Sequence, residues 1–285
     1  MLPLIAEYRK EFHKRLISQG VLSIDRHGIP SNADKSSRLS KMIASRMAQT
    51  LCVETHDKIE GQTLGGHFEN ETKLFIANTF LKLDNLRPGK FHVSRLGNRN
   101  AVTTSSFVQY EHLDYLRDIT RHDTRLASTL GNDYMIAPDI VVYRDPEPDE
   151  FINSEFRVVD DSVCLNSSLR LKDNELPILH ASISAKWTMR SDRAQNSRTE
   201  ALGLIRNRKG HLPHIAVVTA EPLPSRLASL ALGTGDIDCL YHFALYELLE
   251  AVKFVQAEDA MEMLDILIEG KRLKDISDLP LDLAV

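Results

Sequence analysis

The chain has 285 residues, of which 42% are hydrophobic and 26% are charged, and its 35 basic and 40 acidic side chains give a formal net charge of −5. This composition is that of a folded globular protein, and it excludes the disordered, collagen-like and low-complexity classes. The length predicts one large α/β domain or two smaller ones, and the negative net charge argues against a globally basic nucleic-acid binder.

The cellular compartment of the protein is predicted from two features of the sequence: it shows no export signal and no cysteine pattern typical of disulfide bonds. No uninterrupted apolar run approaches the roughly 18 residues that cross a bilayer, and no basic stretch followed by a long apolar one opens the chain. The three cysteines, Cys52, Cys164 and Cys239, are odd in number and far apart, so they predict no disulfide framework. We therefore expect a cytoplasmic protein.

Charge is distributed unevenly along the chain. Residues 186–209 carry seven basic and two acidic side chains, a net charge of +5, whereas residues 246–285 carry four basic and ten acidic ones, a net charge of −6. The basic segment is able to meet phosphate while the acidic end keeps the protein soluble. The alternative is two solvated helix faces of opposite sign, and charge alone does not separate the two interpretations.

The first part of the chain is predicted to be mostly helical. A turn or cap at Asn32-Ala-Asp34 precedes the second helix, Arg87-Pro-Gly89 ends the third, and a short strand is expected over residues 92–96. Apolar residues at helical spacing predict four helices, over residues 5–19, 39–55, 62–83 and 107–128.

The middle of the chain is predicted to contain strands. A β-prone run over 134–143 includes Asp139, and strict alternation over 176–187 predicts a second strand. In that second strand one face is apolar and the other is polar, with the polar face formed by His180, Ser182, Ser184 and Lys186.

The remaining elements alternate between helix and strand. Asp192 and Gln195 have the spacing of a capping box that opens a helix closing at Gly210, and residues 214–220 predict a buried parallel strand. A further helix, a short strand over 237–241 and two terminal helices follow. This alternation implies an α/β fold with a mixed sheet covered by helices on both faces.

We expect a single domain, because no internal repeat or long linker is present. Its parts are an N-terminal helical part over about 1–90, an α/β core over about 91–245 and C-terminal helices over about 246–285.

Four residues from neighbouring elements form the most informative constellation. Asp139 lies within its predicted strand, Ser184 and Lys186 share one face of the next strand, and Glu200 lies about two turns into the following helix. Two carboxylates and an amine that converge in this way are what metal-assisted phosphodiester hydrolysis needs, because carboxylates hold Mg²⁺ and a lysine stabilises charge on the phosphate. Each short motif, taken alone, more often has a structural role.

The order of these residues resembles the PD-(D/E)xK nucleases in a rearranged form. Pro138-Asp139 is followed by Ser184-Ala-Lys186, where a serine replaces the usual acid, and Glu200 supplies the missing carboxylate from the next helix. This form belongs to restriction endonucleases that cut sites with a CCGG core. The resemblance extends over most of the chain and includes Ser31-Asn-Ala-Asp34, Phe68-Glu69, His180-Ala-Ser-Ile-Ser184, Lys186-Trp-Thr188, Arg190-Ser-Asp-Arg-Ala-Gln-Asn196, Arg206-Asn-Arg-Lys-Gly210, Ala231-Leu-Gly-Thr-Gly235 and residues 270–285.

The resemblance implies a Mg²⁺ site with two ions. Asp139 and Glu200 would be the metal-site carboxylates, and the carbonyl of Ala185 would add a ligand. Lys186 would be the catalytic lysine and Ser184 the residue in place of the usual acid.

Glu69, on the long early helix, would complete the acidic cluster with Asp139 and Glu200, which makes five catalytic residues with Ser184 and Lys186. The chain departs from the family over residues 64–67, 99–129 and 146–174.

A second constellation follows the predicted catalytic strand. Arg190, Asp192 and Arg193 alternate donors with an acceptor, and arginine can donate to guanine O6 and N7 while aspartate accepts from cytosine N4. Helix caps and surface ion pairs are the alternative for such a run. The resemblance implies that this segment reads CCGG in the major groove, that Asp34 reads the outer G·C pair and that Gln62 contacts the minor groove.

The resemblance implies a function as well as a fold. We expect a type II restriction endonuclease with the restriction-endonuclease-like core, which hydrolyses double-stranded DNA at GCCGGC with Mg²⁺ and leaves 5′ overhangs. It would be a homotetramer, a dimer of dimers that holds two DNA sites. The alternatives are a repair or junction nuclease of the same fold and a DNA-binding protein that does not cleave.

Overall fold

A computed structural model describes residues 2–53, 61–96, 103–123, 125, 128, 138–233 and 235–285, with the side chains of residues 61 and 62 left out. No helix within these ranges combines the length and apolar character that a membrane crossing requires. The cysteines Cys52, Cys164 and Cys239 are all unpaired, as predicted.

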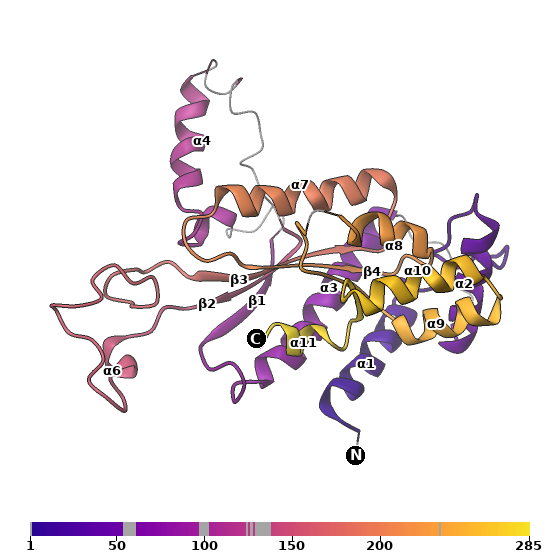
Figure 1. Ribbon diagram of the computed structural model, residues 1–285, viewed down its shortest axis with the longest axis horizontal. Coiled ribbons are helices and arrows are strands. Elements are labelled where there is room, and N and C mark those ends of the chain that lie inside the picture. The colour runs from indigo at the N-terminus through magenta and orange to yellow at the C-terminus, as the bar shows by residue number, and fades with distance from the viewer. Residues whose placement is uncertain are drawn as a thin grey trace.

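One mixed sheet of six strands lies at the centre of the described structure (Figure 1). The first three strands are antiparallel to their neighbours, and the third to the sixth run parallel, so the predicted α/β fold with a mixed sheet is confirmed. In spatial order the strands are β1 (Phe91–Arg95), β2 (Ile140–Arg144), β3 (Ile178–Lys186), β4 (His214–Thr219), β5 (Cys239–His242) and β6 (Leu273–Asp275).

Helices cover both faces of this sheet. Figure 1 shows α7 along one face, and α3 and α1 along the opposite face, with α8, α9 and α10 around the parallel end. The helices are α1 (Leu4–Ser18), α2 (Arg38–Thr50), α3 (Gly61–Thr79), α4 (His112–His122), α6 (Asp149–Ile152), α7 (Ser191–Asn207), α8 (Pro224–Ala231), α9 (Leu245–Phe254), α10 (Glu258–Glu269) and α11 (Leu279–Asp282).

An aromatic contact joins α3 to the end of β3. The rings of Phe68 and Trp187, both buried, lie edge to face with their centroids 5.1 Å apart. Edge-to-face pairs of this kind stabilise a core beyond the area that they bury. Since Glu69 and Lys186 are the chain neighbours of these two rings, the contact sets the distance between two of the predicted site residues.

Most predicted elements are confirmed, with ends shifted by a few residues, and the start of the strand predicted over 134–143 lies outside the described residues. The helix predicted over 107–128 is wrong in its first part, because α4 begins only at His112. Phe107 and Tyr110 are fully buried in turns, and the Val108 amide donates to the Pro177 carbonyl at 3.0 Å. Tertiary contacts therefore replace helical hydrogen bonds over this stretch.

Three further details differ from the sequence predictions. Asp139 lies directly before β2 rather than within a strand. The capping box is wrong: α7 begins at Ser191 with Arg190 as its N-cap and without a side-chain cap hydrogen bond, so Asp192 lies in the first turn. Strand β6 was not predicted, because three residues are too few to show a period.

An ion-pair network ties α1 to the C-terminal part of the chain. The Arg9 guanidinium lies 2.6 Å from a Glu247 carboxylate oxygen on α9 and 2.8 Å from an oxygen of Asp275 on β6. The Asp275 side chain is fully buried, and Arg9 holds the pKa of that carboxyl below its usual value against the opposing effect of burial. Arg9 thus compensates a charge that has no access to water.

Replacing Arg9 by methionine should lower the free energy of unfolding by about 3–5 kcal/mol, because it leaves the buried Asp275 charge without its cation. Urea unfolding at pH 7 measures this loss. The matched control is Arg121→Met, which removes an exposed ion pair with Asp118 on α4 and should change the free energy by less than about 1 kcal/mol. Equal losses in the two variants would contradict the assignment.

Candidate active site

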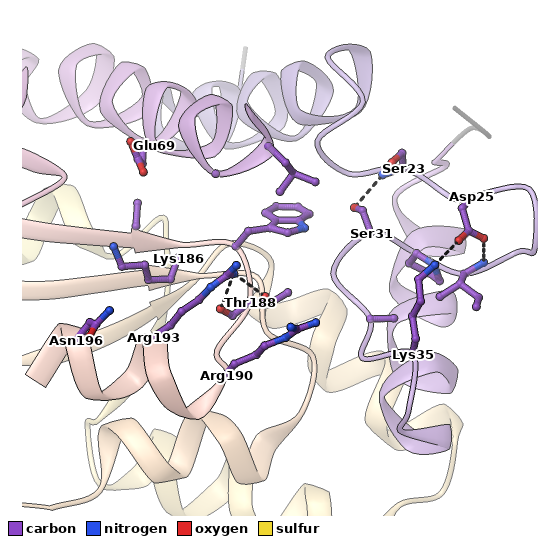
Figure 2. A pocket seen from close by; sticks show the side chains of 17 residues that line it. Ser23, Asp25, Ser31, Lys35, Glu69, Lys186, Thr188, Arg190, Arg193 and Asn196 are labelled. Carbon is purple, nitrogen blue, oxygen red and sulfur yellow. Dashed lines mark hydrogen bonds and ion pairs between the residues drawn. The ribbon is translucent and has the colours of Figure 1, made fainter. Parts of the chain in front are cut away.

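A cleft of about 630 Å³ opens at the carboxyl end of β3. Its walls come from four parts of the chain: the loop before α2, the first turns of α3, the end of β3 and the start of α7 (Figure 2). Figure 2 shows Glu69 on the α3 wall above Lys186, with Arg190 and Arg193 on the α7 side. Residues far apart in the sequence therefore meet around one opening.

Asp139 is fixed against β3 by three hydrogen-bond donors. Strand register pairs Ile140 with Ile183, which places Asp139 opposite Ser184. Its Oδ2 atom accepts from the Ala185 amide at 2.8 Å, the Lys186 ammonium at 2.7 Å and the Ser184 hydroxyl at 3.3 Å. The predicted group of Asp139, Ser184 and Lys186 is thus brought together by the pairing of β2 with β3.

Lys186 remains a cation in this environment. Burial lowers its pKa, but the Asp139 carboxylate outweighs that effect, and Glu200 and Glu69 raise the pKa further, so the net shift is upward. The lysine is therefore the positive centre of a site that contains three acidic residues.

Glu200 faces the same cluster from α7. One turn before it, Ser197 lies with its hydroxyl 3.3 Å from the Ser184 hydroxyl, which joins the helix to β3. Burial raises the pKa of Glu200 to about 7, and the charge of Asp139 adds to the rise, while Lys186 and a hydrogen bond from Ser184 oppose it. The positive charge near this carboxyl group is therefore too small to offset the effect of burial on its pKa.

Glu69 reaches the edge of the cluster and has a partner that sequence reasoning missed. Its carboxylate forms an ion pair with Arg95, at the end of β1. Burial raises the pKa of Glu69, the charge of Asp139 adds to it, and Arg95 and Lys186 oppose the rise. No local signal pointed to Arg95, because the pair joins a helix to an edge strand.

The structure places the five predicted catalytic residues near one another, and two of them, Glu69 and Lys186, line the cleft. Within the part of the chain that the structure describes, no three His, Cys, Asp or Glu side chains lie close enough together to hold a metal ion. Asp139 forms an ion pair with Lys186, and Glu69 forms an ion pair with Arg95. At Ala185 the hydrogen bond to the site is made by the amide N–H rather than by the carbonyl.

Two of the predicted base readers, Arg190 and Arg193, line the cleft. Arg190 and Asp192 are exposed, and Arg193 is half-buried with its guanidinium donating to the Thr188 hydroxyl at 2.9 Å. Arg190 also lines a neighbouring groove of about 750 Å³ together with Asp34, so these two predicted readers share one surface. The side chain of Gln62 lies outside the described part of the structure.

Asp34 is held by Ser36 and by Arg226, which sequence reasoning also missed. The Ser36 hydroxyl and amide donate to its carboxylate at 2.7 and 2.9 Å, and the Arg226 guanidinium of α8 forms an ion pair with it. The hydrogen bonds from Ser36, with the nearby Arg226 charge, lower the pKa of Asp34 to about 2. Its carboxylate is therefore ionised and fixed in orientation.

In metal-free buffer, Glu200→Gln should stabilise the protein by about 1–3 kcal/mol at pH 8 and should leave its stability unchanged near pH 4.5. The pKa of about 7 in the folded chain lies above the ordinary 4.5, so wild-type stability falls as the pH rises between these values. At pH 8 the wild type carries the full cost of the buried charge, whereas the amide carries none. Urea unfolding at both pH values checks this, and equal stability of the two proteins at pH 8 would refute it.

Comparison with known proteins gives the family of the chain. The family model described as NgoMIV restriction enzyme matches residues 12–285. The type II restriction enzyme NgoMIV of Neisseria gonorrhoeae is 49% identical over 286 residues, which covers 100% of both chains. The chain therefore belongs to the NgoMIV restriction enzyme family and is a type II restriction endonuclease.

Proposed function

We propose that the protein hydrolyses phosphodiester bonds of double-stranded DNA at a CCGG-core site, GCCGGC, with Mg²⁺ as its cofactor, and that it leaves 5′ overhangs. The observation that carries this proposal is the cluster of Asp139, Lys186 and Glu200, whose lysine lines the same cleft as Arg190 and Arg193. Hydrolytic groups and donors suited to guanine thus lie in one opening.

The donor set fits Mg²⁺. This ion prefers oxygen ligands and is usually held by one or two carboxylates, with waters and substrate phosphate oxygens in the other positions. Asp139 and Glu200 supply two such carboxylates, and we propose two ions per site, with the Ala185 carbonyl as a further ligand and Glu69 completing the acidic cluster. When bound, Mg²⁺ polarises the scissile phosphate and lowers the pKa of a coordinated water.

The residues of the chain itself act through charge and position. The ammonium of Lys186 is held protonated and stands 2.7 Å from Asp139, where it can orient the attacking water and stabilise negative charge that develops on the phosphate. The Ala185 amide and the Ser184 hydroxyl donate hydrogen bonds to Asp139 and hold its carboxylate in one orientation. The carboxylate can therefore act from this position without any movement of the strand.

Lys186→Ala and Asp139→Ala should each reduce DNA cleavage by about 100-fold or more, while both keep site-specific binding in Ca²⁺. The loss follows because each removes a charge that acts on the reacting phosphate. Cleavage of a sequenced plasmid in Mg²⁺ measures the rate and maps the cut. Lys90→Ala is the control, since this exposed lysine pairs with Asp145 away from the cleft and should leave the rate unchanged.

The same assay separates the proposed function from its alternatives. Discrete bands that map to GCCGGC support it, smears or structure-dependent nicks would indicate a repair or junction nuclease, and retarded but intact DNA would indicate binding alone. A Lys186→Ala rate within tenfold of wild type would contradict the catalytic role of the lysine.

We also propose that the protein is a homotetramer, a dimer of dimers with two DNA sites. The segment between β2 and β3, which we call the arm (residues 145–177), extends away from the sheet in Figure 1. Large apolar side chains that are exposed on one segment are typical of protein–protein contacts. The arm exposes seven large apolar side chains, Phe151, Phe156, Val158, Val163, Leu165, Leu169 and Leu171.

A plasmid with two GCCGGC sites should be cut about tenfold or more faster than a plasmid with one, because tethering raises the effective concentration of the second site. Phe156→Glu on the arm should abolish this advantage and shift the mass in solution to that of a smaller assembly. Phe254→Glu on α9 is the matched control, since its exposed fraction is 63% against 75% for Phe156. Equal rates on both plasmids, with a dimer mass for the wild type, would refute the tetramer.

A further inference from the structure

Glu221 is a fully buried carboxylate outside the catalytic cluster, in the turn between β4 and α8. One of its oxygens, Oε2, accepts from the Met189 amide at 2.8 Å and lies 3.5 Å from the Arg226 guanidinium. The other, Oε1, accepts from the Leu223 amide at 3.2 Å. A buried carboxylate is costly, so its presence calls for a role that an apolar residue would not fill.

The two contacts of Oε2 lead to different parts of the DNA-facing surface. Met189 directly precedes Arg190, the N-cap of α7, so its amide position sets the start of the 190–193 segment. Arg226 forms the ion pair with Asp34 across the neighbouring groove. The Oε2 atom of Glu221 therefore contacts both the start of the 190–193 segment, which contains the predicted inner readers, and Arg226, which holds the predicted outer reader Asp34.

A second contact joins the loop that carries Asp34 to the segment that contains Glu221. The Asn32 side-chain amide, 1% exposed, donates to the carbonyl of Ala220 at 2.9 Å. The loop that carries Asp34 is thus attached directly beside Glu221 as well as through Arg226. Contacts therefore run without a break from the Asp34 loop to residues 220–221, and from there to the Met189 amide.

We propose that Glu221 is a positioning residue that couples the 190–193 segment to the Asp34–Arg226 pair, so that the inner and outer base pairs of the DNA site are recognised together. This inference rests on the proposed recognition of GCCGGC by these residues. As a consequence, DNA that is altered at both the inner and the outer position loses less affinity than the product of the losses caused by the two single alterations. The reason is that the first alteration already weakens the contact at the second position.

The test uses the wild-type protein and four duplexes in Ca²⁺. They contain GCCGGC unmodified, with N4-methylcytosine at the outer cytosine, with 7-deazaguanine at the inner guanine adjoining the centre, or with both, so that the major-groove N4–H donor suited to Asp34 and the N7 acceptor suited to the arginines are removed in turn. A duplex without the site sets the level of non-specific binding. The doubly modified duplex should lose at least about fivefold less affinity than the product of the single losses.

Glu221→Gln should bring the double loss to within twofold of that product, and Glu250→Gln, an exposed carboxylate on α9, should keep the wild-type coupling. Thermal unfolding checks that the variants are folded. If Glu221→Gln does not fold, Arg226→Gln takes its place, because it breaks the contact with Glu221 and leaves the Met189 hydrogen bond intact. The coupling must then be weaker than in the wild type, with the remainder carried by the contact of Asn32 with Ala220, and coupling of wild-type strength would overturn the proposal.

Two results would overturn the proposal, and they differ from failure of the proposed function. Wild-type losses that multiply within twofold, or wild-type coupling retained in the folded Gln variant, overturn the role of Glu221 alone. Equal affinity for unmodified GCCGGC and for the duplex without the site overturns both the role and the proposed function.

Discussion

The register of β2 against β3 is the constraint on which the candidate site depends. Because Ile140 pairs with Ile183, the carboxylate of Asp139 meets the Ala185 amide and the Lys186 ammonium at the carboxyl end of β3. A slip of one residue would move every β3 side chain to the other face of the sheet. The lysine would then point away from α7, and the cluster with Glu200 would not form.

Local sequence patterns were sufficient to predict some of the residues that form part of the candidate site. Alternation over β3 placed Ser184 and Lys186 on one face, and the spacing into the next helix placed Glu200 near them. The capping box failed although its spacing was right, because the chain adopts its extended N-cap conformation at Arg190, two residues before Asp192. A local motif specifies a tendency, and the neighbouring strand decides where the helix starts.

Contacts between distant segments were beyond the reach of the sequence. Arg95 pairs with Glu69 across an element boundary, and Arg226 pairs with Asp34 over most of the length of the chain. Neither arginine stands in a motif, and ion pairs of this kind leave no periodic signal. These arginines nevertheless hold in place one acid of the catalytic cluster and one predicted base reader, so the electrostatics of the cleft are known only from the fold.

The position of the arm has a consequence for how such an enzyme can diversify. The arm connects β2 to β3 at the end of the hairpin opposite Asp139 and Lys186, so insertions or deletions within it leave the strand register untouched. Each doubling of a flexible loop costs only about 0.6 kcal/mol in closure entropy. The surface of this one segment can therefore be rewritten by evolution or by design, while the positions of Asp139 and Lys186 at the far end of the same two strands are inherited unchanged.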